Sequence, residues 1–150
     1  MNCNSNTSIF CTVGRTMRSI TILLEGEFRQ KGIDINLSQF IILNILSTFD
    51  DLILEDLSKL IHKDKSAVMR HVNHLELNDF VTKMKDESDK RRKVLILTEK
   101  GIEVLKNARR VEKKLQENLT KELEKKDIAV FSKVLGHMKD QAVLILDKNH

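Results

Sequence analysis

A group of polar side chains between residues 64 and 75 has the types and spacing that suit hydrogen bonding to the edges of DNA bases. Arg and Lys donate to guanine, Asn pairs with adenine, and Ser can contact a phosphate or a base. On a helix these residues share one face, and the Ala and Met among them could touch thymine methyl groups. The candidate DNA contacts are Lys65, Ser66, Ala67, Met69, Arg70, Asn73 and His74. Taken alone, an ordinary solvated helix surface explains such a face equally well.

A second group of charges lies in the segment DESDKRRK, residues 86–93, where four basic residues follow three acidic ones. A guanidinium at the tip of a loop can enter a narrow minor groove, where the negative potential is enhanced. Asp89 lies two positions before Arg91 and could hold its guanidinium by a charge-assisted hydrogen bond. We therefore expect DNA contacts from Lys90, Arg91 and Arg92, with Asp89 as a support. A solvated charged hairpin is the alternative.

Two short helices must position the first group. The apolar spacing predicts a helix over residues 54–61 and a second helix that Asp64 opens as its N-cap and that ends near Asn78-Asp79. Two short helices joined by a tight connection form a helix-turn-helix unit. The side chains expected to face its core are Leu57, Leu60, Ile61, Val68, Val72 and Leu75.

Two short strands must position the second group. Residues 80–85 alternate apolar and polar side chains, with Val81 and Met84 inward and Thr82, Lys83 and Lys85 outward. Residues 93–97 are their expected partner, and the segment between them is too polar to bury. Strands and loop together form a small β-wing beside the helix-turn-helix unit.

Longer helices flank this unit. The pattern predicts one helix over residues 9–30, ended by Gly32, and another opened by Asn36 and Gln39 as a capping box. Thr98 caps a long helix to about residue 124, and Asp127 opens the last one. The apolar stripes of the first and last helices exceed what one compact unit can bury. A second copy of the chain, related by two-fold symmetry, would cover them.

The bulk composition favours a helix-rich module. The 150-residue chain has 41% hydrophobic and 32% charged residues, no proline, and a net charge of +4 that permits nucleic-acid binding. No apolar run reaches the roughly 18 residues of a membrane span, and no secretion signal opens the chain. We therefore expect a cytoplasmic protein without membrane contact. It also lacks a Gly-rich phosphate loop and paired catalytic groups, so we expect neither an enzyme nor a cofactor.

Residues 57–101 resemble the winged helix-turn-helix of the MarR family of bacterial transcriptional regulators. The matching motifs are Leu57-Ser58, the D-[RK]-S-x-V-x-R pattern at 64–70, and the hydrophobic turn Phe80-Val81. They continue with the wing signature D-x-R at 89–91 and the closing L-T-E-K-G at 97–101. Each motif is weak alone, but their order and spacing are specific.

The resemblance implies a mostly α-helical fold with a small β-wing, in which dimerisation helices flank a winged helix-turn-helix. The whole chain, 1–150, would be a single domain, with residues 9–31 and 99–147 dimerising and residues 36–98 forming the supporting helices and DNA-binding lobe. It further implies a homodimer on a palindromic operator of double-stranded DNA. We expect a repressor that is relieved when a small-molecule effector, such as an aromatic anion, enters a crevice between the dimer helices and the lobe.

Several positions depart from the family pattern. His62 and Asp79 stand where glycine is usual, Lys63 replaces a common apolar residue, and Met69 replaces a common Ser or Thr. The operator sequence therefore cannot be carried over from relatives.

Three alternatives stay open. Cys11 lies near the place of the cysteine in peroxide-sensing relatives, although the chain has no tyrosine to support it. His62, His71 and His74 could share a metal, but they lie beside the expected DNA face, so no metal site is expected. A winged-helix module that binds protein instead of DNA is the third.

Overall fold

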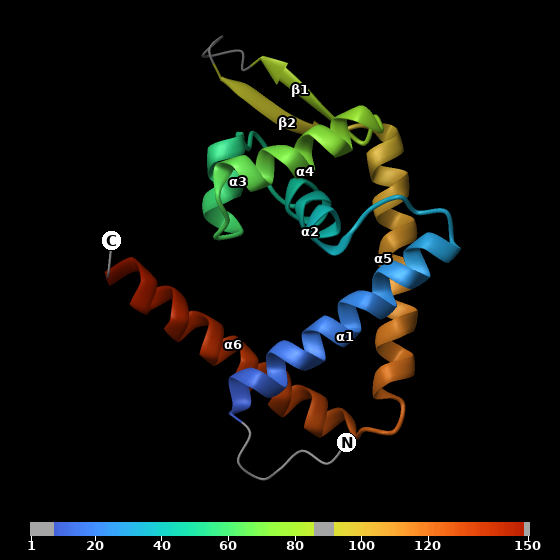
Figure 1. Ribbon diagram of the computed structural model, residues 1–150, viewed down its shortest axis with the longest axis vertical. Coiled ribbons are helices and arrows are strands. Elements are labelled where there is room, and N and C mark those ends of the chain that lie inside the picture. Colours follow the sequence, from blue (N-terminus) through green and yellow to red (C-terminus); the bar gives the residue numbers. More distant parts are fainter. Residues whose placement is uncertain (1–7, 86–91, 149–150) are drawn as a thin grey trace. The chain divides into compact units, whose positions relative to one another are not determined.

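The computed structural model describes residues 8–85 and 92–148, which form helices and one small antiparallel sheet (Figure 1). The elements are α1 (Ile9–Gln30), α2 (Leu37–Leu46), α3 (Leu54–Leu60), α4 (Lys65–Leu77), β1 (Val81–Lys85), β2 (Lys93–Leu97), α5 (Glu99–Thr120) and α6 (Lys125–Lys148). The expected fold class, mostly helical with a small wing, is confirmed. The chain divides into two compact units, residues 1–112 and 113–150, with the boundary inside α5.

Polar caps explain where the first two helices begin. The Ser8 hydroxyl accepts the Phe10 N–H at the start of α1, 3.3 Å apart. At the start of α2, Asn36 Oδ1 accepts the Gln39 N–H (2.9 Å) and Gln39 Oε1 accepts the Asn36 N–H (2.8 Å). The capping box predicted from the sequence is therefore confirmed. Each cap satisfies backbone N–H groups that have no partner inside the helix.

Three helices end in the same way, with a residue in the left-handed region just beyond the last turn. After α1, α3 and α4 that residue is Gly32 (φ 69°), His62 (φ 49°) and Asp79 (φ 60°). In each case its N–H and the next one return to carbonyls of the last turn, as in the Schellman motif. His62 and Asp79, which stand where the family pattern has glycine, thus adopt the conformation that glycine adopts most easily. The prediction that Asp79 helps to end α4 is confirmed.

The core of the first unit lies where α2, α4 and the wing meet. The Phe28 and Phe40 rings pack edge to face with centroids 5.5 Å apart. Its fully buried side chains include Ile42, Leu43, Leu57, Val68, Val72, Leu75 and Val81. The prediction that Val68, Val72 and Leu75 form the inner face of α4 is confirmed. Burying these apolar side chains is the main favourable contribution to folding.

Some predicted core positions are wrong. Leu60 is 46% exposed, and Leu57 is the one fully buried side chain of the seven-residue α3. Met84 is 54% exposed, because it lies three residues after buried Val81 and therefore on the other face of a period-two strand. Lys83, two residues after Val81, is half-buried instead of outward.

The wing pairs β1 with β2 in antiparallel register, with Val81 opposite Leu97 and Lys85 opposite Lys93. The segment before α3 pairs with the other side of β2: Ile53 forms an antiparallel bridge with Val94, and the Leu95 N–H donates to the Leu52 carbonyl at 2.8 Å. β2 therefore has a hydrogen-bonded neighbour on both sides, and the wing is attached to the helix-turn-helix through its backbone.

Side chains at the start of α5 donate hydrogen bonds to the backbone at the end of α4. Thr98 Oγ1 donates to the Asp79 carbonyl (2.6 Å) and accepts the Gly101 N–H (2.9 Å). Lys100 Nζ donates to the Asn78 carbonyl (2.8 Å) and lies 5.2 Å from the centre of the Phe80 ring. The L-T-E-K-G motif is thus a cap for α5 whose side chains also hold the end of α4.

A second polar contact joins α5 to α2. Arg109 donates from Nε to Asn44 Oδ1 at 2.8 Å and from Nη2 to Ser47 Oγ at 2.7 Å. Leu105 and Ala108, on the same side of α5, are buried. Ile102, three residues before Leu105, is 56% exposed, so it lies outside this buried side of α5.

The apolar side chains of the terminal helices remain largely uncovered within the chain. On α6, Val130 and Phe131 are 62% and 58% exposed, and Ile145 is 59% exposed. On α1, Phe10 is 72% exposed, whereas Leu24 and Phe28 in its C-terminal half are buried. Among the described residues, no helix is both long enough and apolar enough to cross a membrane.

Candidate nucleic-acid interface

α4 presents one exposed side to solvent, opposite its buried stripe. We use the name exposed face of α4 for the exposed side chains of residues 65–73, which are Lys65, Ser66, Met69, Arg70 and Asn73; Glu76 and Leu77 in the last turn are also exposed. Ala67 is half-buried at its edge. Asp64 is the N-cap residue, as predicted, although its side chain makes no capping hydrogen bond. The buried side of α4 packs against the core, and hydrogen bonds from the start of α5 hold its C-terminal end. The position of its exposed side chains is therefore fixed by the surrounding structure.

His74 does not belong to this exposed face. It is half-buried and lines a cavity of about 250 Å³ between α1, α2 and α4. Its Nδ1 lies 3.4 Å from Asn78 Nδ2. The sequence put His74 with the polar group because it follows Arg70 by four residues. In the structure that position is at the edge of the exposed face, where the side chain turns toward the cavity.

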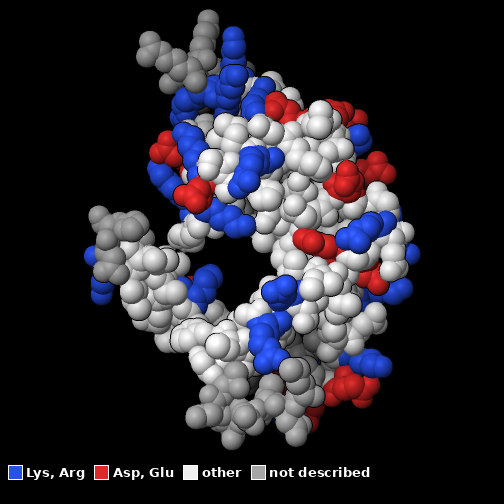
Figure 2. All heavy atoms as spheres, viewed as in Figure 1, with Lys and Arg blue, Asp and Glu red and all other residues white. Residues whose placement is uncertain are grey.

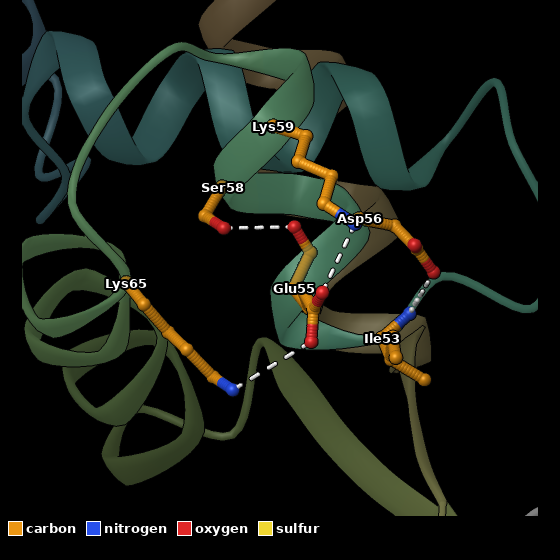
Figure 3. A network of polar contacts seen from close by, with 6 residues as sticks. All are labelled: Ile53, Glu55, Asp56, Ser58, Lys59 and Lys65. Carbon is orange, nitrogen blue, oxygen red and sulfur yellow. Dashed lines mark hydrogen bonds and ion pairs between the residues drawn. The ribbon is translucent and has the colours of Figure 1, made fainter. Parts of the chain in front are cut away.

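Lys65, the first residue of the exposed face, lies near the carboxylate of Glu55 on α3, which also pairs with Lys59 (Figure 3). Glu55 Oε1 lies 2.9 Å from Lys59 Nζ, and Glu55 Oε2 lies 4.0 Å from Lys65 Nζ. The hydrogen bond from Lys59, and then the charges of Lys59 and Lys65, lower the pKa of Glu55. The same hydrogen bond raises the pKa of Lys59. An acidic side chain thus partly neutralises the basic end of the exposed face.

Asn73, the last residue of the exposed face, has a cationic neighbour from the wing. Lys83 Nζ lies 2.6 Å from Glu76 Oε2 and 3.5 Å from Asn73 Oδ1. Sequence reasoning missed this residue, because it placed Lys83 on the outer side of β1. The signal was present, since Lys83 follows Val81 by two residues and shares its face of the strand.

The helix-turn-helix connection adds further positive charge. Lys63 Nζ donates to Ser38 Oγ at 3.0 Å and so ties the connection to α2. Burial, with the charges of Lys63, Arg70 and His74, lowers the pKa of His71 on α4. Figure 2 shows Lys and Arg side chains gathered at the strand end of this unit and along α3 and α4, with a few acidic side chains among them.

The tip of the wing lies outside the described residues, and with it Asp89, Lys90 and Arg91. Their predicted roles stay predictions. Arg92 and Lys93, where the chain enters β2, are exposed.

Two of the alternatives raised by the sequence concern Cys11 and a group of histidines. Cys11 is a free, exposed cysteine in the first turns of α1. Within residues 8–85 and 92–148, no three His, Cys, Asp or Glu side chains are grouped so that they could hold a metal ion.

Comparison with known proteins agrees with this architecture. The model of the MarR family matches residues 35–93. An uncharacterised HTH-type transcriptional regulator of Bacillus subtilis, YybA, is 31% identical over 98 residues, which cover 65% of this chain and 64% of that protein. The chain thus spans a little under two thirds of the length of this relative.

Solved structures show the same fold at lower identity. A crystal structure of MarR superposes with a TM-score of 0.86 at 18% identity and covers 99% of both chains. The transcriptional repressor CouR, solved bound to a 23-mer DNA duplex, superposes with a TM-score of 0.82 at 15% identity, over 93% of this chain and 99% of that one. The helix-turn-helix, the wing and the flanking helices all have their counterparts in this group, so the fold is that of a winged helix-turn-helix protein, and residues 35–93 match the model of the MarR family.

Proposed function

We propose that the protein is a transcriptional regulator, not an enzyme, that binds double-stranded DNA and represses transcription from a palindromic operator. The observation that carries the proposal is the exposed face of α4, which presents side chains able to hydrogen-bond to base edges from a well-packed helix-turn-helix. A helix of this kind fits the major groove, while an adjoining wing can reach the minor groove. A protein with this role acts in the bacterial cytoplasm, where the DNA lies.

The contacts would be divided between reading and anchoring. Arg70, Ser66 and Asn73 offer hydrogen bonds to base edges, and Met69 offers an apolar surface to thymine methyl groups. Lys65, Lys90 and Arg92 would meet phosphates. Arg91, with support from Asp89, would enter the minor groove, where narrow A-tracts attract arginine.

A homodimer forms the second part of the proposal. The exposed apolar side chains of α1 and α6 would be covered by the same helices of a second copy. The two units of each chain would then work as one MarR-like domain. Two copies of α4 about one helical turn apart, roughly 34 Å, would suit a palindromic site.

A small-molecule effector is the third part. The cavity between α1, α2 and α4 is lined by Arg29 as well as by Glu25 and Asp34. Glu25 is already engaged, since its Oε1 accepts the Leu37 N–H at 2.9 Å. Arg29 would attract an anion, and a bound ligand beside His74 would press on the inner side of α4. Oxidation of exposed Cys11 is the alternative signal.

Selection of bound fragments from random DNA tests the regulatory function and yields the operator. With that operator, Arg70→Ala and Arg91→Ala should each weaken binding by about 1–3 kcal/mol. Arg110→Ala, on exposed α5, is the matched control and should bind like wild type. Equal binding by all four proteins would contradict the assignment of α4 and the wing.

Three further measurements address the signal and the competing function. Small aromatic acids should raise the melting temperature of the wild type but not of Arg29→Gln, with Arg18→Gln as the control on α1. A response to peroxide that Cys11→Ser abolishes would favour redox sensing instead. If no DNA fragment is retained at low salt while a protein partner is, the chain is an interaction module.

A further inference from the structure

Lys83 is a side chain of the wing that reaches the exposed face of α4. It lies on β1 opposite Leu95, on the strand face shared with buried Val81, and its side chain is only 23% exposed. Its ammonium lies between two residues one turn apart on α4, at 2.6 Å from the Glu76 carboxylate and 3.5 Å from the Asn73 amide oxygen. The short contact with Glu76 holds the ammonium beside Asn73.

This placement restricts how Asn73 can present its amide. An ammonium carries only donors, so it can face the oxygen of the amide but not its NH₂ group. With Oδ1 toward Lys83, the NH₂ group of Asn73 points away as a donor. Lys83 also compensates the negative charge of Glu76, which would otherwise repel a phosphate beside the same face of α4.

We propose that Lys83 is a positioning residue that makes Asn73 a hydrogen-bond donor and thereby determines which base it selects. In the major groove guanine, adenine and thymine each present an acceptor, whereas cytosine presents a donor. Asn73 held in this way would discriminate against cytosine at one base of each half-site. An amide free to turn over would accept from cytosine as well. The inference rests on the proposed function, because it requires α4 to read bases.

The test compares base preferences selected from random DNA by the wild type, Lys83→Met, Lys83→Arg and Glu76→Gln. Lys83→Met should lose discrimination against cytosine by roughly 3- to 10-fold at a single position per half-site, the scale of one base contact. Lys83→Arg, which still carries only donors, should restore it. Glu76→Gln, at an exposed site of α4, should reduce the discrimination against cytosine at the same base position, although Lys83 itself is unchanged.

Asn73→Ala identifies the position and serves as the reference background. Adding Lys83→Met to Asn73→Ala should change the preference no further, because the lysine acts through the asparagine. Circular dichroism confirms that each variant is folded. If Lys83→Met disturbs β1, the base preference of Glu76→Gln, which leaves the strand unaltered, decides the test.

Two results would overturn the inference alone. One is an unchanged base preference in Lys83→Met and Glu76→Gln. The other is a loss of affinity that is equal for all sequences, with a salt dependence lowered by about one phosphate contact, which would make Lys83 a phosphate ligand. If the wild type enriches no sequence at all, the proposed function itself is wrong, and the inference fails with it.

Discussion

Glu55 is an acidic residue near the basic end of α4, and its charge would oppose the proposed binding of phosphates there. It shares its carboxylate between Lys59 and Lys65. Glu55→Gln should release both ammonium groups and raise affinity for DNA by roughly 2- to 5-fold at low salt, with the gain fading as salt screens exposed charges. Fluorescence anisotropy over a salt series measures this.

Glu103→Gln, the same charge change on an exposed part of α5, is the control for net charge alone. An equal gain in both variants would mean that the Glu55 carboxylate has no specific effect on Lys65.

His71 makes the stability of the first unit depend on pH. Its pKa lies below the ordinary value of 6.5, chiefly because of burial and then because of the charges of Lys63, Arg70 and His74. The unfolded chain therefore binds this proton more readily, so the contribution is present above pH 6.5 and is lost as pH falls from there through the lowered pKa. His71→Gln should flatten the fall in melting temperature between about pH 7.5 and about pH 5.5.

Lys63→Gln keeps His71 but removes one of the charges that lower its pKa, so it should flatten the same curve in part. A pH profile unaltered by His71→Gln would contradict the role of this residue.

His62 carries backbone strain where α3 ends. Its φ of 49° lies in the left-handed region, which costs a residue with a Cβ about 1–2 kcal/mol. Glycine avoids this cost, but it also makes the unfolded chain more flexible, which offsets part of the gain. His62→Gly should therefore stabilise the first unit by about 0.5–1 kcal/mol in urea unfolding. His62→Ala keeps Cβ and is the matched control. A stability gain as large for alanine as for glycine would show that the imidazole, not the φ angle, is the cause.

At the scale of elements, the contact between α5 and the end of α4 depends on one glycine. A Cβ on Gly101 would lie 1.9 Å from the Phe80 carbonyl oxygen, a backbone atom that cannot move without disturbing the turn after α4. Gly101→Ala should cost about 1–3 kcal/mol of stability despite the better helix propensity of alanine. Because the clash would move the turn that follows α4, the substitution should also shift α4 and weaken DNA binding.

Gly26→Ala in α1 is the matched control, because an added Cβ there meets no atom within 4 Å. It should gain up to about 1 kcal/mol, the difference in propensity between the two residues. Equal effects of the two substitutions in urea unfolding would contradict the close approach of α5 to Phe80.

At the scale of the whole molecule, the uncovered apolar side chains of α6 predict the oligomeric state. Phe131 and Ile145 are each more than half exposed within the chain. Phe131→Glu and Ile145→Glu should each shift the protein from dimer to monomer in sedimentation equilibrium, because a buried charge without a partner opposes association. Both variants should lose affinity for the palindromic site while keeping weak binding to a half-site.

Ser132→Glu, at an exposed polar position of the same helix, should remain dimeric. A wild type that sediments as a monomer at micromolar concentration would contradict the predicted dimer.

Local patterns in the chain are enough to predict the order of the elements and the face of α4 that points to solvent. Capping residues such as Asn36 and Thr98, together with the period of apolar residues on α4, act within one or two turns, so they can be recognised without the fold. The exposed candidates Lys65, Ser66, Met69, Arg70 and Asn73 therefore lie where the pattern predicted.

The neighbours that surround that face depend on the packing of distant segments. The turn of His74 toward a cavity and the contact of Lys83 with Asn73 depend on how α1, α2 and the wing pack against α4. Such contacts join residues that are far apart along the chain or on different elements, and no local pattern encodes the distance between them. Periodicity shows which side of a helix is polar, but packing decides which charged groups meet there.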